Sequence, residues 1–180
     1  MRLRLRVKDS VLYNIAFQAM QVLAWGMGFN KDDSAGYLAN HLARLFAREL
    51  QLRIKPLGLS TGTFPALLVL WEGDGLTQRE LIEHLDIEQP TMANTLARME
   101  RDGLIERRKD PADARAQRIW LTAAARALES LATAAAEAAN NKALAGLAPA
   151  ERAIFLGLIR RVIAGLQEET TATGGQDGAA

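Results

Sequence analysis

Residues 75–104 read GLTQRELIEHLDIEQPTMANTLARMERDGL, and this stretch predicts two helices joined by a tight turn. The first helix opens at Thr77, whose hydroxyl can accept from the amide three residues on while the Glu80 carboxylate reaches back to form a capping box. It ends near Leu85. Pro90 fits the first position of the second helix because its missing N–H would have no helical partner there. The stretch therefore predicts a helix-turn-helix.

The second helix, expected from about Gln89 to Asp102, has an apolar and a polar side. Gly103 suits its C-terminal stop, where a left-handed residue is common. The apolar side chains are those of Met92, Leu96 and Met99. The polar side chains are those of Thr91, Asn94, Thr95, Arg98 and Arg101. Such an open polar side can enter a DNA major groove, which is about 12 Å wide.

A basic hairpin follows the two helices. Residues 104–108 and 117–121 have strand-like patterns, and a polar tip with a proline turn joins them. The order of helix, turn, helix and hairpin is that of a winged helix-turn-helix. The hairpin tip can reach an adjacent minor groove, whose negative potential attracts arginine. From Arg98 to Arg118 there are seven basic and five acidic residues, which is a modest net charge of +2.

Helices are expected on both sides of this unit. The first runs through residues 33–55 and is stopped by Pro56 and Gly58; a second, capped within residues 60–63, runs to Trp71. After the hairpin, Thr122 caps an alanine-rich helix to about Leu144. The expected segments are an extension (1–30), one domain (31–169) and a disordered tail (170–180). The domain consists of a winged helix-turn-helix (59–121) and flanking helices (33–55 and 122–168, the last ending at Glu168).

The first 30 residues allow three interpretations. Four basic residues precede an uncharged stretch, which is the outline of a signal peptide. A polar stripe at helical spacing instead favours an amphipathic helix over Val11–Trp25 that packs on another element. The third interpretation is a start-codon artefact, because Met20 and Met27 are both possible starts. We expect the amphipathic helix.

Composition narrows the class of protein. The 180 residues are 49% hydrophobic and 6% aromatic, with Leu and Ala prominent, so helix is favoured and one domain is expected. The net charge of +1 says nothing about nucleic acid by itself. The absence of cysteine excludes disulfides, thiolate metal sites and cysteine nucleophiles. It agrees with a cytoplasmic location, which we expect.

Two motifs together resemble a known family. The segment from Asp113 to Thr122 fits the pattern D-x-R-x-x-x-I/V/L-x-L-T, with Arg115, Ile119 and Leu121 in the matching places. That pattern is the wing signature of the MarR family of transcriptional regulators. The helix-turn-helix segments 75–81 and 92–104 fit the same family, and the resemblance extends over residues 33–168.

The resemblance implies a fold, an assembly and a function. The fold is mainly α-helical, with a small two- to three-stranded antiparallel β-wing. Such proteins are homodimers whose N- and C-terminal helices interlock, and each protomer reads half of a near-palindromic operator in double-stranded DNA. A small, often aromatic or acidic effector binds between the dimerisation helices and the DNA-binding lobe and usually releases the DNA. Repression is the commoner outcome.

The resemblance also assigns residues to DNA. Arg115 enters the minor groove, Asp113 supports the arginines of the wing, and residues 89–98 form the recognition helix. The expected DNA-binding residues are Thr77, Gln78, Gln89, Pro90, Thr91, Asn94, Thr95, Arg98, Arg108, Lys109, Asp113, Arg115 and Arg118. The alternative for these residues is an ordinary solvated helix and hairpin surface.

An effector site is expected at a basic stripe and two aromatic residues. His41, Arg44 and Arg48 share one helix face and can bind an anion, whereas Phe64 and Trp71 can form an aromatic wall. The alternatives are a solvated basic stripe and a packed core. The two histidines lie 43 positions apart without a carboxylate partner at ligand spacing, so we expect neither a metal site nor a cofactor.

Other function classes receive less support. The sequence lacks the nucleophile-elbow, P-loop, dinucleotide and zinc-protease motifs, so an enzyme is not expected. One alternative is a winged-helix protein–protein adaptor without DNA binding, and another is an enzyme built on the effector pocket. No membrane partner is expected.

Overall fold

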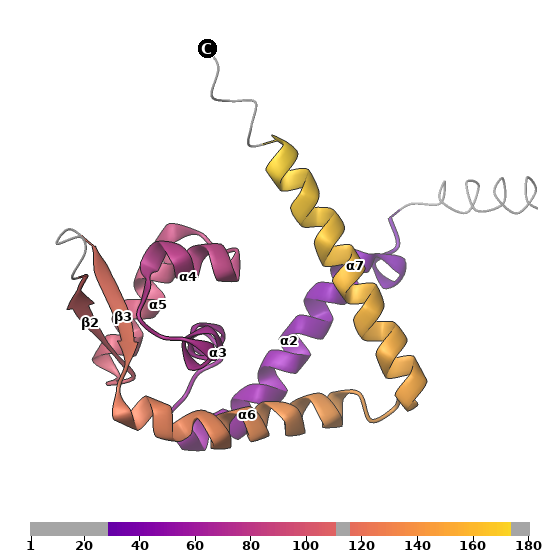
Figure 1. Cartoon of the computed structure of the whole chain (residues 1–180). Coiled ribbons are helices and arrows are strands. Elements are labelled where there is room, and N and C mark those ends of the chain that lie inside the picture. The colour runs from indigo at the N-terminus through magenta and orange to yellow at the C-terminus, as the bar shows by residue number, and fades with distance from the viewer. Residues whose placement is uncertain (1–28, 111–115, 174–180) are drawn as a thin grey trace, which may run out of the picture. The chain divides into compact units, whose positions relative to one another are not determined.

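The computed structural model describes residues 29–110 and 116–173 of the chain (Figure 1). The helix expected at Val11–Trp25 lies outside these residues. The chain divides into two units after Leu45, and each unit is described by itself. Within the described ranges, no helix is both long enough and apolar enough to cross a membrane.

The architecture is mainly helical with one small antiparallel sheet, which confirms the predicted fold class. The elements are η1 (Lys31–Asp33), α2 (Ala35–Ile54), η2 (Lys55–Leu57), α3 (Phe64–Glu72), β1 (Leu76–Thr77), α4 (Gln78–Leu85), α5 (Gln89–Arg101), β2 (Ile105–Lys109), β3 (Gln117–Leu121), α6 (Ala123–Ala143) and α7 (Pro149–Thr173). Helices α4 and α5 are the predicted helix-turn-helix, and β2 and β3 are the predicted wing strands.

The sheet contains a third strand that the sequence pattern did not locate. The strand order is β1-β3-β2, and β1 pairs Leu76 with Ile119 and Thr77 with Arg118. Two residues are too few to show a strand periodicity, so β1 is visible only through its partner. This short strand joins the wing directly to the start of α4.

Two expectations about helix ends are wrong. Helix α7 continues to Thr173, past the predicted end at Glu168 and into the segment expected to be disordered. Thr63 stands at the N-cap position of α3 but makes no capping hydrogen bond. Its hydroxyl instead donates to the Ser60 carbonyl at 3.1 Å, because this local turn offers the hydroxyl an acceptor.

The core lies inside the winged helix-turn-helix. Helices α3, α4 and α5 and strand β3 supply most of the large side chains that are fully buried. These residues are Ile54, Leu67, Leu70, Leu81, Met92, Leu96, Met99 and Ile119. A three-helix core of this kind holds α5 at a fixed orientation relative to the wing.

Candidate nucleic-acid interface

Helix α5 presents an exposed polar row on the side opposite the core. Met92, Leu96 and Met99 are fully buried, as the pattern predicts. The exposed residues on the other side are Gln89, Pro90, Thr91, Asn94 and Arg98. Among them, Gln, Asn and Thr side chains can donate and accept hydrogen bonds at base edges, and all the polar ones, including Arg98, can donate to phosphates.

Thr95 is an exception and corrects the prediction. Its side chain is only 4% exposed, because it lies three residues after Met92 and four before Met99 on the packed side of the helix. Its polarity suggests the open side of the helix, whereas its angular position is on the packed side. Thr95 is therefore part of the core and has no free surface for DNA.

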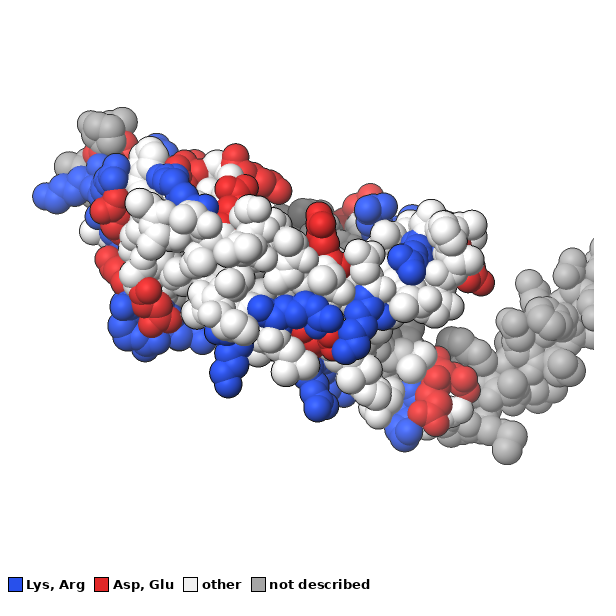
Figure 2. Space-filling view, turned by 90° about the horizontal axis from the view of Figure 1, so that it is seen from below, with Lys and Arg blue, Asp and Glu red and all other residues white. Residues whose placement is uncertain are grey.

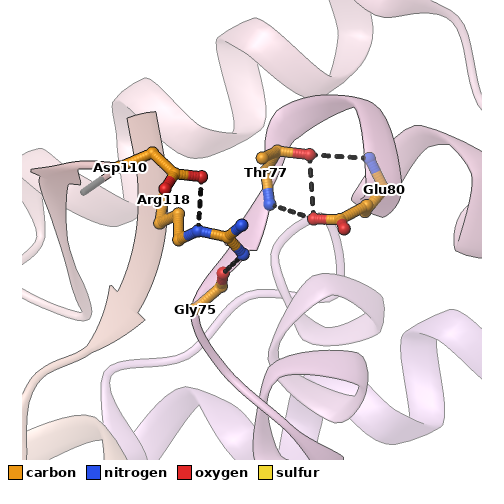
Figure 3. Close-up of polar contacts among 5 residues, drawn as sticks. All are labelled: Gly75, Thr77, Glu80, Asp110 and Arg118. Atoms are coloured by element: carbon orange, nitrogen blue, oxygen red, sulfur yellow. Dashed lines mark hydrogen bonds and ion pairs between the residues drawn. The ribbon is translucent and has the colours of Figure 1, made fainter. Parts of the chain in front are cut away.

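The start of α4 is fixed by the predicted capping box (Figure 3). The Glu80 backbone N–H donates to the Thr77 hydroxyl at 3.2 Å, and the Thr77 backbone N–H donates to the Glu80 carboxylate at 2.6 Å. Two hydrogen bonds to the Glu80 carboxylate, from the Thr77 backbone N–H first and from the Thr77 hydroxyl second, hold the pKa of Glu80 below its ordinary value. The Thr77 hydroxyl also donates to Glu80, so it is used within the protein, whereas Gln78 is half-buried in the first turn.

The wing carries cations that are mostly paired with acids. Arg108 pairs with Glu106 and lies over the Trp120 ring, with 5.3 Å between the guanidinium carbon and the ring centroid. Lys109 is exposed at the end of β2. Figure 2 shows blue Lys and Arg side chains with red acidic side chains between them on one face of the protein. The mixture agrees with the modest net charge of this segment.

Arg118 is held within the protein. Its Nε donates to the Asp110 carboxylate at 2.7 Å, and a terminal nitrogen donates to the Gly75 carbonyl at 2.8 Å (Figure 3). The structure therefore gives this residue internal contacts that the DNA-binding prediction did not include. Asp113 and Arg115 lie outside the described residues, so their roles stay predictions.

A surface cleft of about 910 Å³ lies along α4 and the turn that leads into α5. Two predicted DNA-binding residues, Gln78 and Gln89, line it together with three acids and one arginine. The lining residues are Gln78, Arg79, Ile82, Glu83, Asp86, Ile87, Glu88 and Gln89. The acids outnumber the single cation, which is paired with Glu83 at 2.9 Å, so the cleft itself does not attract phosphate.

Comparison with known proteins relates this geometry to a family. The sequence profile described as "MarR family" matches residues 57–116. The transcriptional regulator HosA of Escherichia coli O111:H- is 30% identical over 105 residues, which are 58% of this chain and 78% of HosA. The chain belongs to the MarR family of transcriptional regulators. Alignments with curated regulators of this kind span between 54% and 78% of their lengths.

Solved structures agree with the MarR-family fold. A probable transcriptional regulator from Pseudomonas aeruginosa is similar with a TM-score of 0.69 and 29% identity, over 74% of this chain and 99% of that one. The Mycobacterium tuberculosis MarR family protein Rv2887, solved in complex with salicylic acid, is similar with a TM-score of 0.58 and 28% identity, over 72% of this chain and 96% of that one.

The residues expected at the effector site of this MarR-family chain fall in both units. His41 and Arg44 are exposed on the part of α2 before residue 46, and Arg48 is exposed after it. Phe64 is buried in the core and meets Trp71 edge-on, with 6.1 Å between the ring centroids. The Trp71 indole N–H donates to the Ala125 carbonyl at 3.0 Å. Both aromatic residues therefore have packing roles, and their effector role stays a prediction.

One group of connecting residues was missed by the sequence reasoning. Asp74 accepts from the Leu121 backbone N–H at 3.0 Å and pairs with Arg126 at 2.5 Å. It therefore connects the turn before β1 to strand β3 and helix α6. The sequence presents Asp74 only as one residue of a glycine-rich turn, and no local pattern reveals partners about 50 positions away.

Proposed function

We propose that this MarR-family protein is a homodimeric, ligand-responsive repressor that binds a near-palindromic operator. The observation that carries the proposal is the exposed polar row of α5. The buried apolar side of the same helix fixes this row in place, and the wing lies next to it. A helix presented in this way fits a major groove, and a wing beside it fits the neighbouring backbone or minor groove. We place the protein in the cytoplasm, because a chromosomal operator is its substrate in this proposal.

Base reading is assigned to the exposed part of α5. Asn94 can make a bidentate contact to adenine, and Thr91 can contact either a base or a phosphate. Lys109 and the predicted minor-groove residue Arg115 supply positive charge from the wing. Thr95 has no part in this interface, because its side chain is buried.

A second copy of the chain is proposed to cover the apolar residues of α2 and α7. Each of these helices exposes a stripe of large apolar side chains. Those of α2 are Leu38, Leu42, Leu45 and Leu52, and those of α7 are Ile154, Leu156, Leu158, Val162, Ile163 and Leu166. Large apolar patches are seldom left exposed on monomeric soluble proteins. Self-association through these stripes brings two winged units onto one operator.

An aromatic or acidic small molecule is the proposed effector. Support comes from the basic residues His41, Arg44 and Arg48, and from the salicylic acid in the complex of Rv2887. A carboxylate can pair with a guanidinium, and its ring can pack on apolar side chains. In this proposal, effector binding lowers the affinity for the operator.

The test begins with selection of genomic DNA fragments on the full-length protein. Fluorescence anisotropy then compares a selected fragment with a scrambled one at two salt concentrations. We expect selective, salt-dependent binding by a dimer, and Asn94→Ala should cost about 1–3 kcal/mol at one operator position. Thr95→Ser is a matched control that should leave the base preference unchanged. If no fragment is preferred over scrambled DNA, the DNA-binding proposal is wrong and an adaptor function takes its place.

The effector part has its own test. Salicylate is titrated into the protein–operator complex, and Arg44→Gln is compared with the wild-type protein. We expect salicylate to release the DNA and the variant to need more of it. Release that is equal in both proteins would exclude Arg44 from the effector site.

A further inference from the structure

We propose that Arg118 is a positioning residue that holds the wing against the start of α4, rather than one of the residues that contact phosphate. The inference rests on the proposed DNA-binding function and deepens it. It replaces a predicted direct contact with an internal brace among Arg118, Asp110 and Gly75. Figure 3 shows these residues together with the capping box of α4.

The brace joins segments that are far apart in the sequence. Arg118 lies on β3, opposite Arg108 of β2 and Thr77 of β1. Its guanidinium reaches Asp110, just after β2, at 2.7 Å and the Gly75 carbonyl, just before β1, at 2.8 Å. One planar group with a fixed set of donors therefore fixes the tip end of the β2–β3 hairpin relative to the segment that leads into α4.

Burial of Asp110 explains why the guanidinium is needed there. The side chain of Asp110 is 7% exposed, and it is the only buried charged residue in the part of the chain that the structure describes. A buried carboxylate costs much free energy unless a cation and hydrogen bonds compensate its charge. Arg118, which is 35% exposed, supplies both. Moving the guanidinium to a phosphate would break this ion pair with the buried carboxylate.

Gly75 makes the other end of the brace rigid. Its backbone has a φ of +81°, and a Cβ atom there would lie 2.8 Å from the Trp120 ring. Its N–H donates to the Ile119 carbonyl at 2.8 Å, so β3 holds both polar groups of this peptide segment. The start of α4, which carries Gln78, is therefore positioned from the wing.

The chain offers a matched control for this brace. Lys109 is an exposed cation at the same end of the wing, and among the described residues it forms no ion pair. If Lys109 neutralises a phosphate, Lys109→Gln should reduce the slope of log affinity against log salt by about 0.9 per protomer. A positioning residue lowers the affinity without changing that slope.

The experiment compares wild type with Arg118→Gln, Arg118→Lys, Asp110→Asn and Lys109→Gln on a selected operator across a salt series. We expect Arg118→Gln to weaken binding about fivefold, as loss of a partly exposed ion pair worth ~1 kcal/mol implies, with an unchanged slope. Arg118→Lys should recover part of the loss. Asp110→Asn removes a negative charge near the DNA, so charge alone predicts tighter binding, whereas the brace predicts weaker binding.

Hydrogen exchange of the free proteins gives a readout that needs no DNA. We expect faster exchange at Leu76 and along β3 in Arg118→Gln and Asp110→Asn, and no change in Lys109→Gln. Unchanged exchange in Arg118→Gln and Asp110→Asn would overturn the brace. A reduced salt slope in Arg118→Gln together with tighter DNA binding by Asp110→Asn would overturn it as well. Wild-type protein that selects no operator would instead refute the proposed function, and the role of Arg118 in DNA binding with it.

Discussion

The winged helix-turn-helix and helix α7 differ in how much apolar surface they bury within one chain. In the winged unit, Leu81, Leu96 and Met99 are completely buried. In α7, none of the side chains described, residues 149–168, is buried, and Val162 is 63% exposed. The winged helix-turn-helix contains its own core. Helix α7 presents an apolar stripe that no other described part of residues 46–173 buries.

The difference shows which surfaces each region needs for its stability. A helix gains most of its stability in a protein by packing an apolar side, since propensity alone is weak. The winged unit obtains this packing from α3, α4, α5 and β3. Helix α7 needs another surface, and we infer that a second copy supplies it. The two regions should therefore respond differently to substitution and to protein concentration.

The largest expected effect comes from a charge in the stripe of α7. Val162→Asp would place an unpaired carboxylate in the proposed dimer interface, and twofold symmetry would do so twice. We expect the dimer dissociation constant to rise at least ~100-fold, because even one such burial costs several kcal/mol. Sedimentation analysis over a concentration range measures this shift. Arg160→Gln, on the same helix, is the control, and an unchanged dimer in Val162→Asp would remove the stripe from the interface.

Truncation of a core side chain in the winged helix-turn-helix should lower the free energy of unfolding by the same amount at every protein concentration. Leu96→Ala removes a fully buried side chain and should lower the free energy of unfolding by about 2–5 kcal/mol. Leu158→Ala, on the exposed stripe, is the matched comparison. Chemical denaturation at two protein concentrations should show a concentration-dependent loss for Leu158→Ala only. The same dependence in both variants would mean that the winged unit does not contain its own core.

The connection from the winged unit to α6 should have an intermediate effect. Asp74→Ala leaves the Leu121 N–H without its acceptor, and we expect a loss of about 1–3 kcal/mol in unfolding free energy. Arg126→Ala removes only the half-exposed ion pair and should cost ~1 kcal/mol or less. Thermal unfolding of both variants measures the difference. Equal losses would assign the effect to the ion pair instead of to the backbone contact.

Local signals in the sequence were sufficient for the helix-turn-helix. The capping box at Thr77 and the proline at position 90 act within a few residues, so they predict helix starts directly. The alternation of residues in 117–121 likewise predicts β3. These features define the positions of α5 and the wing, and therefore most of the candidate interface.

Long-range contacts were beyond the same reasoning. Strand β1 exists because β3 pairs with it, and Arg118 has internal partners because Asp110 and Gly75 approach it across the fold. Polarity predicts Thr95 on the open side of α5, but its spacing from Met92 and Met99 places it on the packed side. A helical wheel of α5 could have found the last of these errors, but nothing local could have found the first two.

The smallest expected effect is confined to the start of α4 and should be pH-dependent. Hydrogen bonds from Thr77 hold the pKa of Glu80 below its ordinary value in the folded protein. The folded state therefore binds this proton less readily than the unfolded state does. The resulting stability is present above the unfolded pKa and is lost as the pH falls through the folded pKa.

Two variants isolate this contribution within the winged unit. Thr77→Ala should lower the unfolding free energy at neutral pH by ~1 kcal/mol through loss of the cap. Glu80→Gln keeps the size of the side chain but removes its titration, so its unfolding free energy should change less than that of wild type as the pH falls below about 5. Chemical denaturation across that pH range measures both. Parallel pH profiles for wild type and Glu80→Gln would show that the loss of stability at low pH arises outside the capping box. Other carboxylates of the winged helix-turn-helix would then be responsible for it.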